Sequence, residues 1–228
     1  MSELLPCLER DVVPAPGAAP DAAVIWMHGL GADASDFDPV VPLLPLPEGS
    51  AIRFVFPNAP MRAITINGGM RMPGWYDIAG FGERDQDEAG IRESQRAVDA
   101  LLAREVARGI ASTRVVLAGF SQGGVVALQS GLRQALPLGG ILALSTYLGL
   151  ASSLRAEQTD ANLNTPIFMT HGTQDAVIPI DLARRSRQTL QAHGHPVQWQ
   201  EYPMGHEVCQ AEIAAIGQWL GRVLAPLR

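Results

Sequence analysis

Cysteine is almost absent from this 228-residue chain, which contains only Cys7 and Cys209. Two cysteines so far apart in the sequence form no disulfide framework, and neither has the spacing of a zinc site or of a CxxC redox motif. We therefore expect a protein of the reducing cytoplasm, with no bound metal.

The sequence also lacks a long apolar run and an excess of basic residues. The longest nearly apolar stretch, residues 138–151, is shorter than the ~20 residues that span a bilayer. Residues 1–11 carry acids and a proline where a secretory signal needs a basic start and an unbroken apolar run. The 17 basic and 23 acidic side chains give a net charge of -6, which disfavours a phosphate-backbone partner. We expect no export, no stable membrane insertion and no nucleic-acid binding.

The length and the 47% of hydrophobic residues are enough for one substantial core, so we expect a single domain over residues 1–228. Apolar runs of strand length alternate with segments of helical periodicity, which is typical of a parallel sheet covered by helices on both faces. The predicted strands are residues 22–27, 52–56, 114–118, 140–144, 167–170 and 197–202.

The helical segments have one long member and three shorter ones, predicted over residues 86–108, 122–135, 181–192 and 207–224. The buried stripe expected on the long helix consists of Ile91, Ala97, Val98, Leu101, Leu102 and Val106. Prolines are too frequent in residues 39–60 for a regular helix, so loop and short turns are expected there. Residues 68–82, rich in glycine and aromatic side chains, are expected to form an irregular excursion over the surface.

The motif with the most specific chemical meaning is Gly-Phe-Ser-Gln-Gly at residues 119–123. It follows a predicted strand and opens a predicted helix, which is the context in which G-x-S-x-G indicates a nucleophile elbow. Gly119 and Gly123 leave room for neighbouring chain around a serine with a strained backbone. The same pattern arises by chance in many sequences, and it is the strand–turn–helix context that favours Ser121 as a nucleophile.

A serine nucleophile needs an imidazole to take its proton and a carboxylate to orient that imidazole. In a parallel sheet such groups lie on loops at the carboxyl ends of the strands. His206 follows the strand 197–202 and precedes the last helix, so we predict that it is the general base. The chain order Ser, Asp, His then favours Asp175, just after the strand 167–170, as the orienting acid. The alternative for Asp175 is a turn or capping role.

The remaining histidines receive structural interpretations. His28 and His171 each stand at the end of a strand before a glycine, where an imidazole ring often braces a turn through a hydrogen bond. His193 and His195 precede the strand 197–202, and we expect them at the opposite edge of the sheet, on the surface.

Two backbone N–H groups are candidates for binding an oxyanion. Gln122 N–H stands at the start of the helix after the elbow, where free N–H groups and the helix dipole favour negative charge. Leu30 N–H lies in the segment His-Gly-Leu-Gly after the first predicted strand, where the second donor of such a site belongs. Because both donors are backbone groups, neither side chain has to be polar.

Two other chemistries fail on their context. Residues 29–34 match a permissive dinucleotide fingerprint, but Pro39 and Pro42 prevent the long helix that should follow, and the next strand ends without an acidic residue for a ribose. A zinc-protease reading of His206 fails because position 210 is Gln where a second histidine is required. We expect neither a cofactor nor a metal.

With these residues placed, nearly the whole chain resembles the bacterial carboxylesterase branch of the phospholipase/carboxylesterase family, which includes acyl-protein thioesterases and lysophospholipases. The resemblance implies an α/β-hydrolase fold, with a mostly parallel central sheet and helices on both faces. The interval 145–166 is too short for a separate lid domain. The matching segments are residues 28–31, 67–70, 75–77, 119–124, 144–148, 171–175 with Pro179, and 205–206.

The resemblance also implies a cofactor-free esterase for short to medium acyl esters of small molecules or lipids, in frequent homodimers. It carries over the roles assigned to Ser121, Asp175 and His206 and to the N–H groups of Leu30 and Gln122. Trp75 and Leu148 resemble acyl-pocket wall residues, although each could equally be ordinary core.

The expected function is therefore a serine carboxylesterase that works through an acyl-enzyme intermediate, with an open site and broad specificity. An acyl-protein thioesterase or lysophospholipase with the same three residues is the alternative within the enzymes. A non-catalytic scaffold of the same fold is the alternative outside them.

Overall fold

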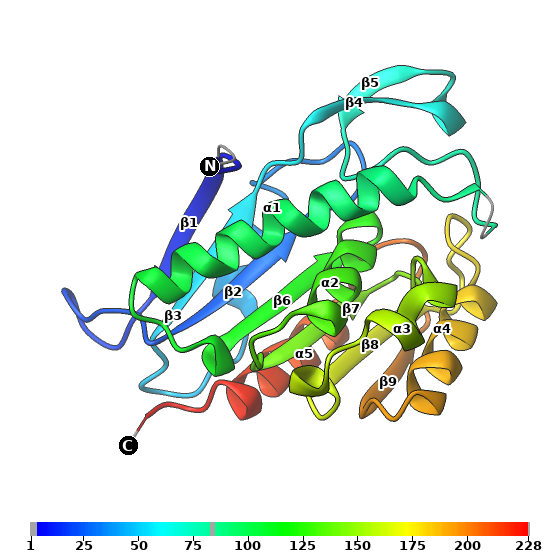
Figure 1. The fold of residues 1–228 in the computed structure, drawn as a ribbon. Helices are drawn as coiled ribbons and strands as arrows, with labels where there is room; N and C mark the ends of the chain where they lie inside the picture. Colours follow the sequence, from blue (N-terminus) through cyan, green and yellow to red (C-terminus); the bar gives the residue numbers. More distant parts are fainter. Residues whose placement is uncertain (1–3, 83–84, 228) are drawn as a thin grey trace.

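The computed structural model describes residues 4–82 and 85–227. Residues 1–3, part of the stretch from which no export signal is predicted, lie outside the described residues. The main element is a seven-stranded sheet in the order β1-β3-β2-β6-β7-β8-β9 (Figure 1). All neighbouring strands are parallel except β1 and β3. The strands are β1 (Cys7–Val12), β2 (Ala22–Met27), β3 (Ile52–Pro57), β6 (Val115–Phe120), β7 (Gly140–Leu144), β8 (Ile167–Gly172) and β9 (Val197–Tyr202).

The mostly parallel sheet predicted from the alternating pattern is confirmed, and each of the six predicted strands is present. The sequence analysis missed β1, whose segment Cys-Leu-Glu-Arg-Asp-Val carries three charged residues and has no fully buried position. An edge strand pairs on one side only and can remain polar, so its sequence lacks the apolar run of a central strand.

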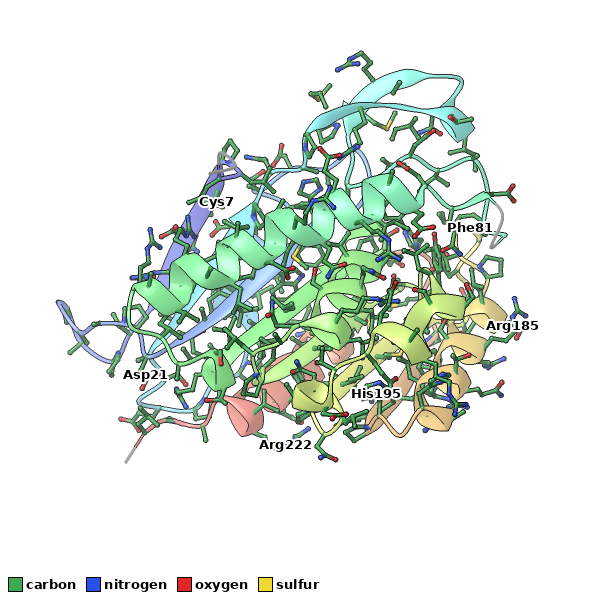
Figure 2. All side chains as sticks on the ribbon, in the orientation of Figure 1. Cys7, Asp21, Phe81, Arg185, His195 and Arg222 are labelled. Atoms are coloured by element: carbon green, nitrogen blue, oxygen red, sulfur yellow. The ribbon has the colours of Figure 1, made fainter. Side chains whose placement is uncertain are left out.

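Helices cover both faces of this sheet. One face carries α1 (Glu88–Ala107), α2 (Gln122–Arg133) and α4 (Ile180–Ala192), whose apolar side chains join one core cluster with β2, β6 and β7. The other carries α5 (Gln210–Val223) and the 3-10 helix η1 (Asp38–Leu43), which share a second cluster with the opposite side of the same strands. Figure 2 shows the side chains that fill these layers.

Two predicted segments differ from the structure. The last helix begins at Gln210 rather than at residue 207, which leaves residues 206–209 outside any helix. The excursion predicted over residues 68–82 contains a regular element, because β5 (Met70–Pro73) pairs antiparallel with β4 (Met61–Ile64). This hairpin stands apart from the main sheet, above the N-terminal end of α1 in Figure 1. The short helix α3 (Leu154–Glu157) follows β7 and precedes β8 in the sequence.

The buried stripe of α1 is predicted wrongly at one position. Val106 is 36% exposed, whereas its neighbour Glu105 is fully buried. The Glu105 carboxylate accepts hydrogen bonds from Arg53, Arg104 and Arg108. A buried carboxylate is stable only when it is paired and hydrogen-bonded, and these guanidinium groups supply that pairing.

A second buried acid, Glu212 on α5, has no such cation. Its side chain is fully buried and accepts a hydrogen bond from the Thr170 hydroxyl, while its second oxygen has no partner among the described residues. Burial raises the pKa of Glu212 to about 7 from an ordinary value of 4.5. The folded protein therefore keeps this proton in a pH range where the unfolded chain releases it.

Substitutions of Glu105 and Val106 test whether Glu105, and not Val106, belongs to the buried face of α1. We expect Glu105→Ala to lower the free energy of unfolding by roughly 1.5–3 kcal/mol, because it removes a fully buried carboxylate that accepts charged hydrogen bonds from three arginines, which keep only Glu9 and Asp11 as partners. Val106→Ala, the matched control one residue away, should cost less than about 1 kcal/mol. Urea unfolding of both variants checks this, and equal costs would contradict the assignment of Glu105 to the core.

Glu212 gives a test with a defined direction in pH. Because the pKa of Glu212 is higher in the folded than in the unfolded state, Glu212 should lower the free energy of unfolding little near pH 4.5 and by its full amount above pH 7. We expect Glu212→Gln to gain roughly 3 kcal/mol relative to wild type between these limits, at 1.36 kcal/mol per pH unit. Urea unfolding from pH 4.5 to 8 measures the difference, with the exposed Glu48→Gln as control. A difference that is constant with pH would contradict the prediction.

Candidate active site

The candidate site is built around the turn between β6 and α2, where Ser121 has φ 54° and ψ −118°. Positive φ is strained for a residue with a side chain, and here it is held by the hydrogen bond from Ser121 N–H to Leu144 O at 2.9 Å. A Cβ at Gly123 would lie 2.4 Å from the Met27 carbonyl oxygen, so only glycine lets α2 start this close to the end of β2. The turn thus presents the Ser121 hydroxyl at the carboxyl edge of the sheet.

The loops after β8 and β9 meet beside this turn. Backbone hydrogen bonds join Thr173 N–H to Tyr202 O and Gln174 N–H to Met204 O, at 2.8 and 3.0 Å. A Cβ at Gly172 would lie 2.3 Å from the Gly205 carbonyl oxygen, so this contact also requires glycine. The two loops are therefore fixed to each other where one carries Asp175 and the other His206.

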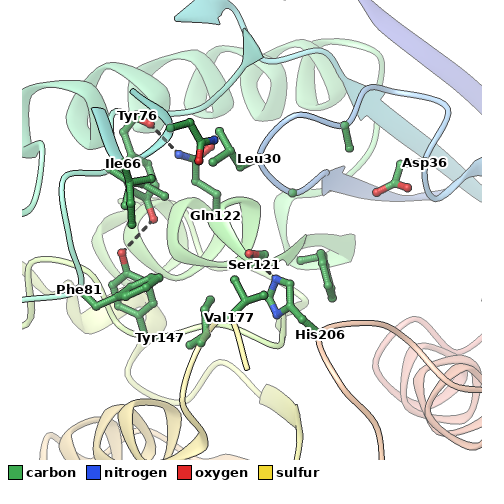
Figure 3. Close-up of a pocket in the computed structure, with 16 residues that line it drawn as sticks. Leu30, Asp36, Ile66, Tyr76, Phe81, Ser121, Gln122, Tyr147, Val177 and His206 are labelled. Atoms are coloured by element: carbon green, nitrogen blue, oxygen red, sulfur yellow. Dashed lines mark hydrogen bonds between the residues drawn. The ribbon is translucent and has the colours of Figure 1, made fainter. Parts of the chain in front are cut away.

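The structure brings the three predicted side chains into a continuous hydrogen-bonded series. The His206 Nε2 and Ser121 Oγ atoms are 2.9 Å apart (Figure 3), and His206 Nδ1 lies 2.7 Å from Asp175 Oδ2. The His206 side chain is 16% exposed and the Asp175 side chain is fully buried. An imidazole with a carboxylate on Nδ1 and a hydroxyl on Nε2 is arranged to take the hydroxyl proton.

The Asp175 carboxylate also accepts two backbone hydrogen bonds on its other oxygen. The N–H groups of Val177 and Ile178 donate to Oδ1 at 2.9 and 2.8 Å. Asp175 therefore forms the turn that was its alternative interpretation, and it forms it together with the bond to His206. The turn and the contact with His206 use different oxygens of the carboxylate, so one does not exclude the other.

The predicted oxyanion donors lie next to Ser121. Gln122 is the first residue of α2, and the chain at Gly29 passes so close that a Cβ there would lie 3.6 Å from Ser121 Cβ. The adjacent Gly31 N–H donates to Pro73 O at 2.8 Å. Within residues 4–82 and 85–227, the N–H groups of Leu30 and Gln122 make no hydrogen bond to the protein. Both N–H groups are therefore available to a bound oxygen.

A cavity of about 400 Å³ opens beside these groups, and Ser121, Gln122 and His206 form part of its wall. Its opposite side contains two tyrosines, Tyr76 and Tyr147, whose hydroxyl oxygens are 3.2 Å apart (Figure 3). The rest of the wall is mostly apolar and includes Leu30, Ile66, Ile78, Phe81, Phe120 and Val177. Such a lining suits a hydrocarbon chain attached to a carbonyl group at Ser121.

Trp75 and Leu148, which resemble acyl-pocket walls in the sequence, do not line this cavity. The Trp75 indole N–H donates to His28 O at 2.9 Å, and its backbone N–H donates to the Gln122 side-chain oxygen at 2.7 Å. These two bonds hold Trp75 fully buried, and it reaches a separate cavity behind the site. Leu148 lines a third cavity, beyond Tyr147. Neither residue contacts the space next to Ser121.

The histidines assigned structural roles are distributed as follows. His28 braces its turn, since Nδ1–H donates to Gly29 O at 2.6 Å and Nε2 accepts from Ala59 N–H at 3.1 Å. His193 and His195 precede β9, whereas Ser121 follows β6, so the two histidines lie at the opposite edge of the parallel sheet. The surface position predicted for His195 is wrong, because its ring is only 3% exposed and contacts the side-chain oxygen of Gln158 at 3.3 Å.

Sequence reasoning did not identify two features of the site. The Gln122 side chain links the elbow to residues 75–76, as it accepts from Trp75 N–H and donates to Tyr76 O at 2.6 Å. The cavity wall formed by Ile66, Phe81 and Val177 was likewise not predicted. No motif marks the three wall positions, because Ile66 and Phe81 lie more than 90 residues before Val177 and join it in one wall only after folding.

None of the helices in residues 4–82 and 85–227 has the length and apolar content needed to cross a membrane. The same residues hold no group of three or more His, Cys, Asp or Glu side chains arranged to bind a metal ion.

Comparison with known proteins gives consistent results. The family model described as Phospholipase/Carboxylesterase matches residues 8–224. A protein named acyl-protein thioesterase 1 from Gibberella zeae is 37% identical over 215 residues, which cover 90% of this chain and 92% of that protein. The protein of the same name from Neurospora crassa is 39% identical over 209 residues, with 87% and 85% covered.

Solved structures agree with these sequence relatives. Arabidopsis thaliana SOBER1 has 29% identity and a TM-score of 0.83, covering 89% of this chain and 99% of that one. Zea mays acyl-protein thioesterase 2 has 27% identity and a TM-score of 0.83, covering 96% and 99%. These relatives come from fungi and plants, so they do not support the bacterial branch named in the sequence analysis. The chain belongs to the phospholipase/carboxylesterase family, and it is a hydrolase of esters or thioesters with the α/β-hydrolase fold.

Proposed function

We propose that this protein is a serine hydrolase that cleaves acyl thioesters, with oxyesters as secondary substrates, through an acyl-enzyme on Ser121. The observation that carries the proposal is the series Ser121, His206 and Asp175, with contacts of 2.9 and 2.7 Å beside a largely apolar cavity. In this proposal each side chain has one role: nucleophile, general base and orienting acid.

The first half-reaction follows from these contacts. The Ser121 oxygen attacks the acyl carbonyl carbon while His206 Nε2 accepts the hydroxyl proton, and Asp175 stabilises the resulting imidazolium. The carbonyl oxygen becomes negatively charged and is bound by the N–H groups of Leu30 and Gln122. His206 then returns the proton to the departing thiol or alcohol, leaving the acyl group on Ser121. In the second half-reaction His206 activates a water that releases the acid.

The choice of thioesters rests on the cavity and on the relatives. The apolar wall binds the acyl chain, while Asp36 and Asn67 at other points of the lining leave polar surface for a leaving group. The relatives of 37 and 39% identity are named acyl-protein thioesterases, which supports lipid-modified protein thioesters as substrates. The second candidate is a general carboxylesterase, supported by esterase PE8 at 26% identity and a TM-score of 0.79.

Replacing the nucleophile tests the proposal. Ser121→Ala should lower kcat by about 10⁴-fold or more, since a triad without its nucleophile retains only binding and oxyanion stabilisation. Ser130→Ala is a matched control, because Ser130 is a buried serine on the same α2 helix, and its activity should match wild type. Hydrolysis of a p-nitrophenyl ester and labelling with a fluorophosphonate measure both variants. Labelling of Ser121→Ala at the wild-type rate would refute the assignment.

Matched substrate pairs distinguish the two candidate functions. We expect the octanoyl thioester to have a kcat/KM above that of the octanoyl oxyester by roughly tenfold, or about 1.4 kcal/mol in the transition state. Each value is divided by the rate of hydroxide hydrolysis of the same compound, which removes intrinsic reactivity. If the oxyester were preferred at every chain length tested, the carboxylesterase function would replace the thioesterase one.

A further inference from the structure

A second histidine contacts the carboxylate of Asp175. His171 stands near the end of β8, is fully buried, and stacks on the Trp199 ring of β9 with ring centroids 6.4 Å apart. It is not among the residues that line the cavity beside Ser121. Any effect of His171 on the reaction must therefore pass through another residue.

The hydrogen bond of the His171 ring and its nearest acidic neighbour fix which nitrogen carries the proton. Nε2 lies 2.9 Å from the Ile178 carbonyl oxygen and 3.3 Å from Asp175 Oδ2. Both of these oxygens can only accept, so Nε2 must be the protonated nitrogen. Nδ1 has no partner among the described residues, and burial lowers the pKa of the ring, which agrees with a neutral imidazole.

The same bonds tie the Asp175 loop to β8 at two points. Ile178 donates its N–H to Asp175 Oδ1 and accepts at its carbonyl from His171, so the imidazole ring lies across the turn that holds the carboxylate. Asp175 Oδ2, in turn, lies between His206 Nδ1 at 2.7 Å and His171 Nε2 at 3.3 Å. The buried carboxylate thus has four N–H groups around it, and His171 provides one of them.

The other charged groups near His171 are already paired. Glu201, opposite His171 in the register of β8 and β9, accepts from Arg184 and from the Trp199 indole N–H. Arg187 of α4 lies over the Trp199 ring, with its guanidinium carbon 5.3 Å from the ring centroid. Asp175 is therefore the acidic partner left for the ring.

Building on the proposed function, we propose that His171 is a positioning residue: its Nε2–H, which donates to Ile178 O and lies 3.3 Å from Asp175 Oδ2, holds the Asp175 carboxylate where His206 needs it. Without this donor the Asp175 turn loses its anchor on β8, and the carboxylate is free to shift relative to the imidazole. Since a misplacement of about 1 Å can cost about 10²-fold in rate, the loss should appear in kcat. KM should not change, because His171 does not contact the cavity.

Two substitutions separate positioning from packing. His171→Leu fills the space but has no donor, whereas His171→Gln places a side-chain N–H at a similar distance from the backbone. We expect His171→Leu to lower kcat per fluorophosphonate-titrated site by about 10- to 100-fold with KM unchanged, and His171→Gln to stay within a few-fold of wild type. Equal losses in the two variants, or a His171→Leu kcat within threefold of wild type, would overturn the proposal.

Nuclear magnetic resonance gives a readout that needs no substrate. In ¹⁵N-histidine-labelled wild-type protein, His171 should be neutral with its proton on Nε2, and the Nδ1–H of His206 should give a downfield proton signal. That signal should persist in His171→Gln and move upfield or broaden in His171→Leu. A proton on Nδ1 of His171 in the wild type would overturn the proposal even if His171→Leu failed to fold. Wild-type protein that neither hydrolyses esters nor reacts with fluorophosphonate would instead refute the proposed function, and these spectra would still decide the role of His171.

Discussion

The site depends on backbone approaching backbone at two glycines. At Gly123 the first turn of α2 passes the carbonyl oxygens that end β2, and at Gly172 the loop after β8 passes the loop after β9. A single Cβ at either position would fall within 2.4 Å of a carbonyl oxygen. Because these contacts set the distances between loops, they also set the distances between the side chains of Ser121, Asp175 and His206.

The carboxyl groups of Glu105, Asp175 and Glu212 have fully buried side chains, and each is stabilised differently. Glu105 is surrounded by guanidinium groups, so its charge is neutralised by opposite charge. Asp175 is surrounded by N–H groups from Val177, Ile178 and two imidazoles, which stabilise the charge without cancelling it. Glu212 has one hydroxyl donor, and its raised pKa shows that burial favours the protonated form. Only the environment of Asp175 leaves a negative charge directed at His206, which is the arrangement that an imidazole base requires.

Much of the wall of the cavity beside Ser121 comes from segments outside the strands of the main sheet. Ile66 and Phe81 come from the connections around the β4–β5 hairpin, and Val177 follows Asp175 directly in its turn. The Gln122 side chain fixes Trp75 and Tyr76 to the turn at Ser121, so one residue connects the cavity wall to that turn.

The sequence by itself determined the parallel sheet, the strand–turn–helix around Ser121 and the family, because periodicity and short motifs are local properties of the chain. It also singled out Asp175 and His206, since their positions after successive strands follow from the direction of a parallel sheet; their catalytic roles stay a prediction. The edge strand β1, the burial of Glu105 in place of Val106, and the burial of His195 were decided by tertiary packing. So were the exclusion of Trp75 and Leu148 from the cavity and the contact between His171 and Asp175. Each of these depends on which distant segment covers a residue, and the sequence around that residue does not encode the distance to its partner.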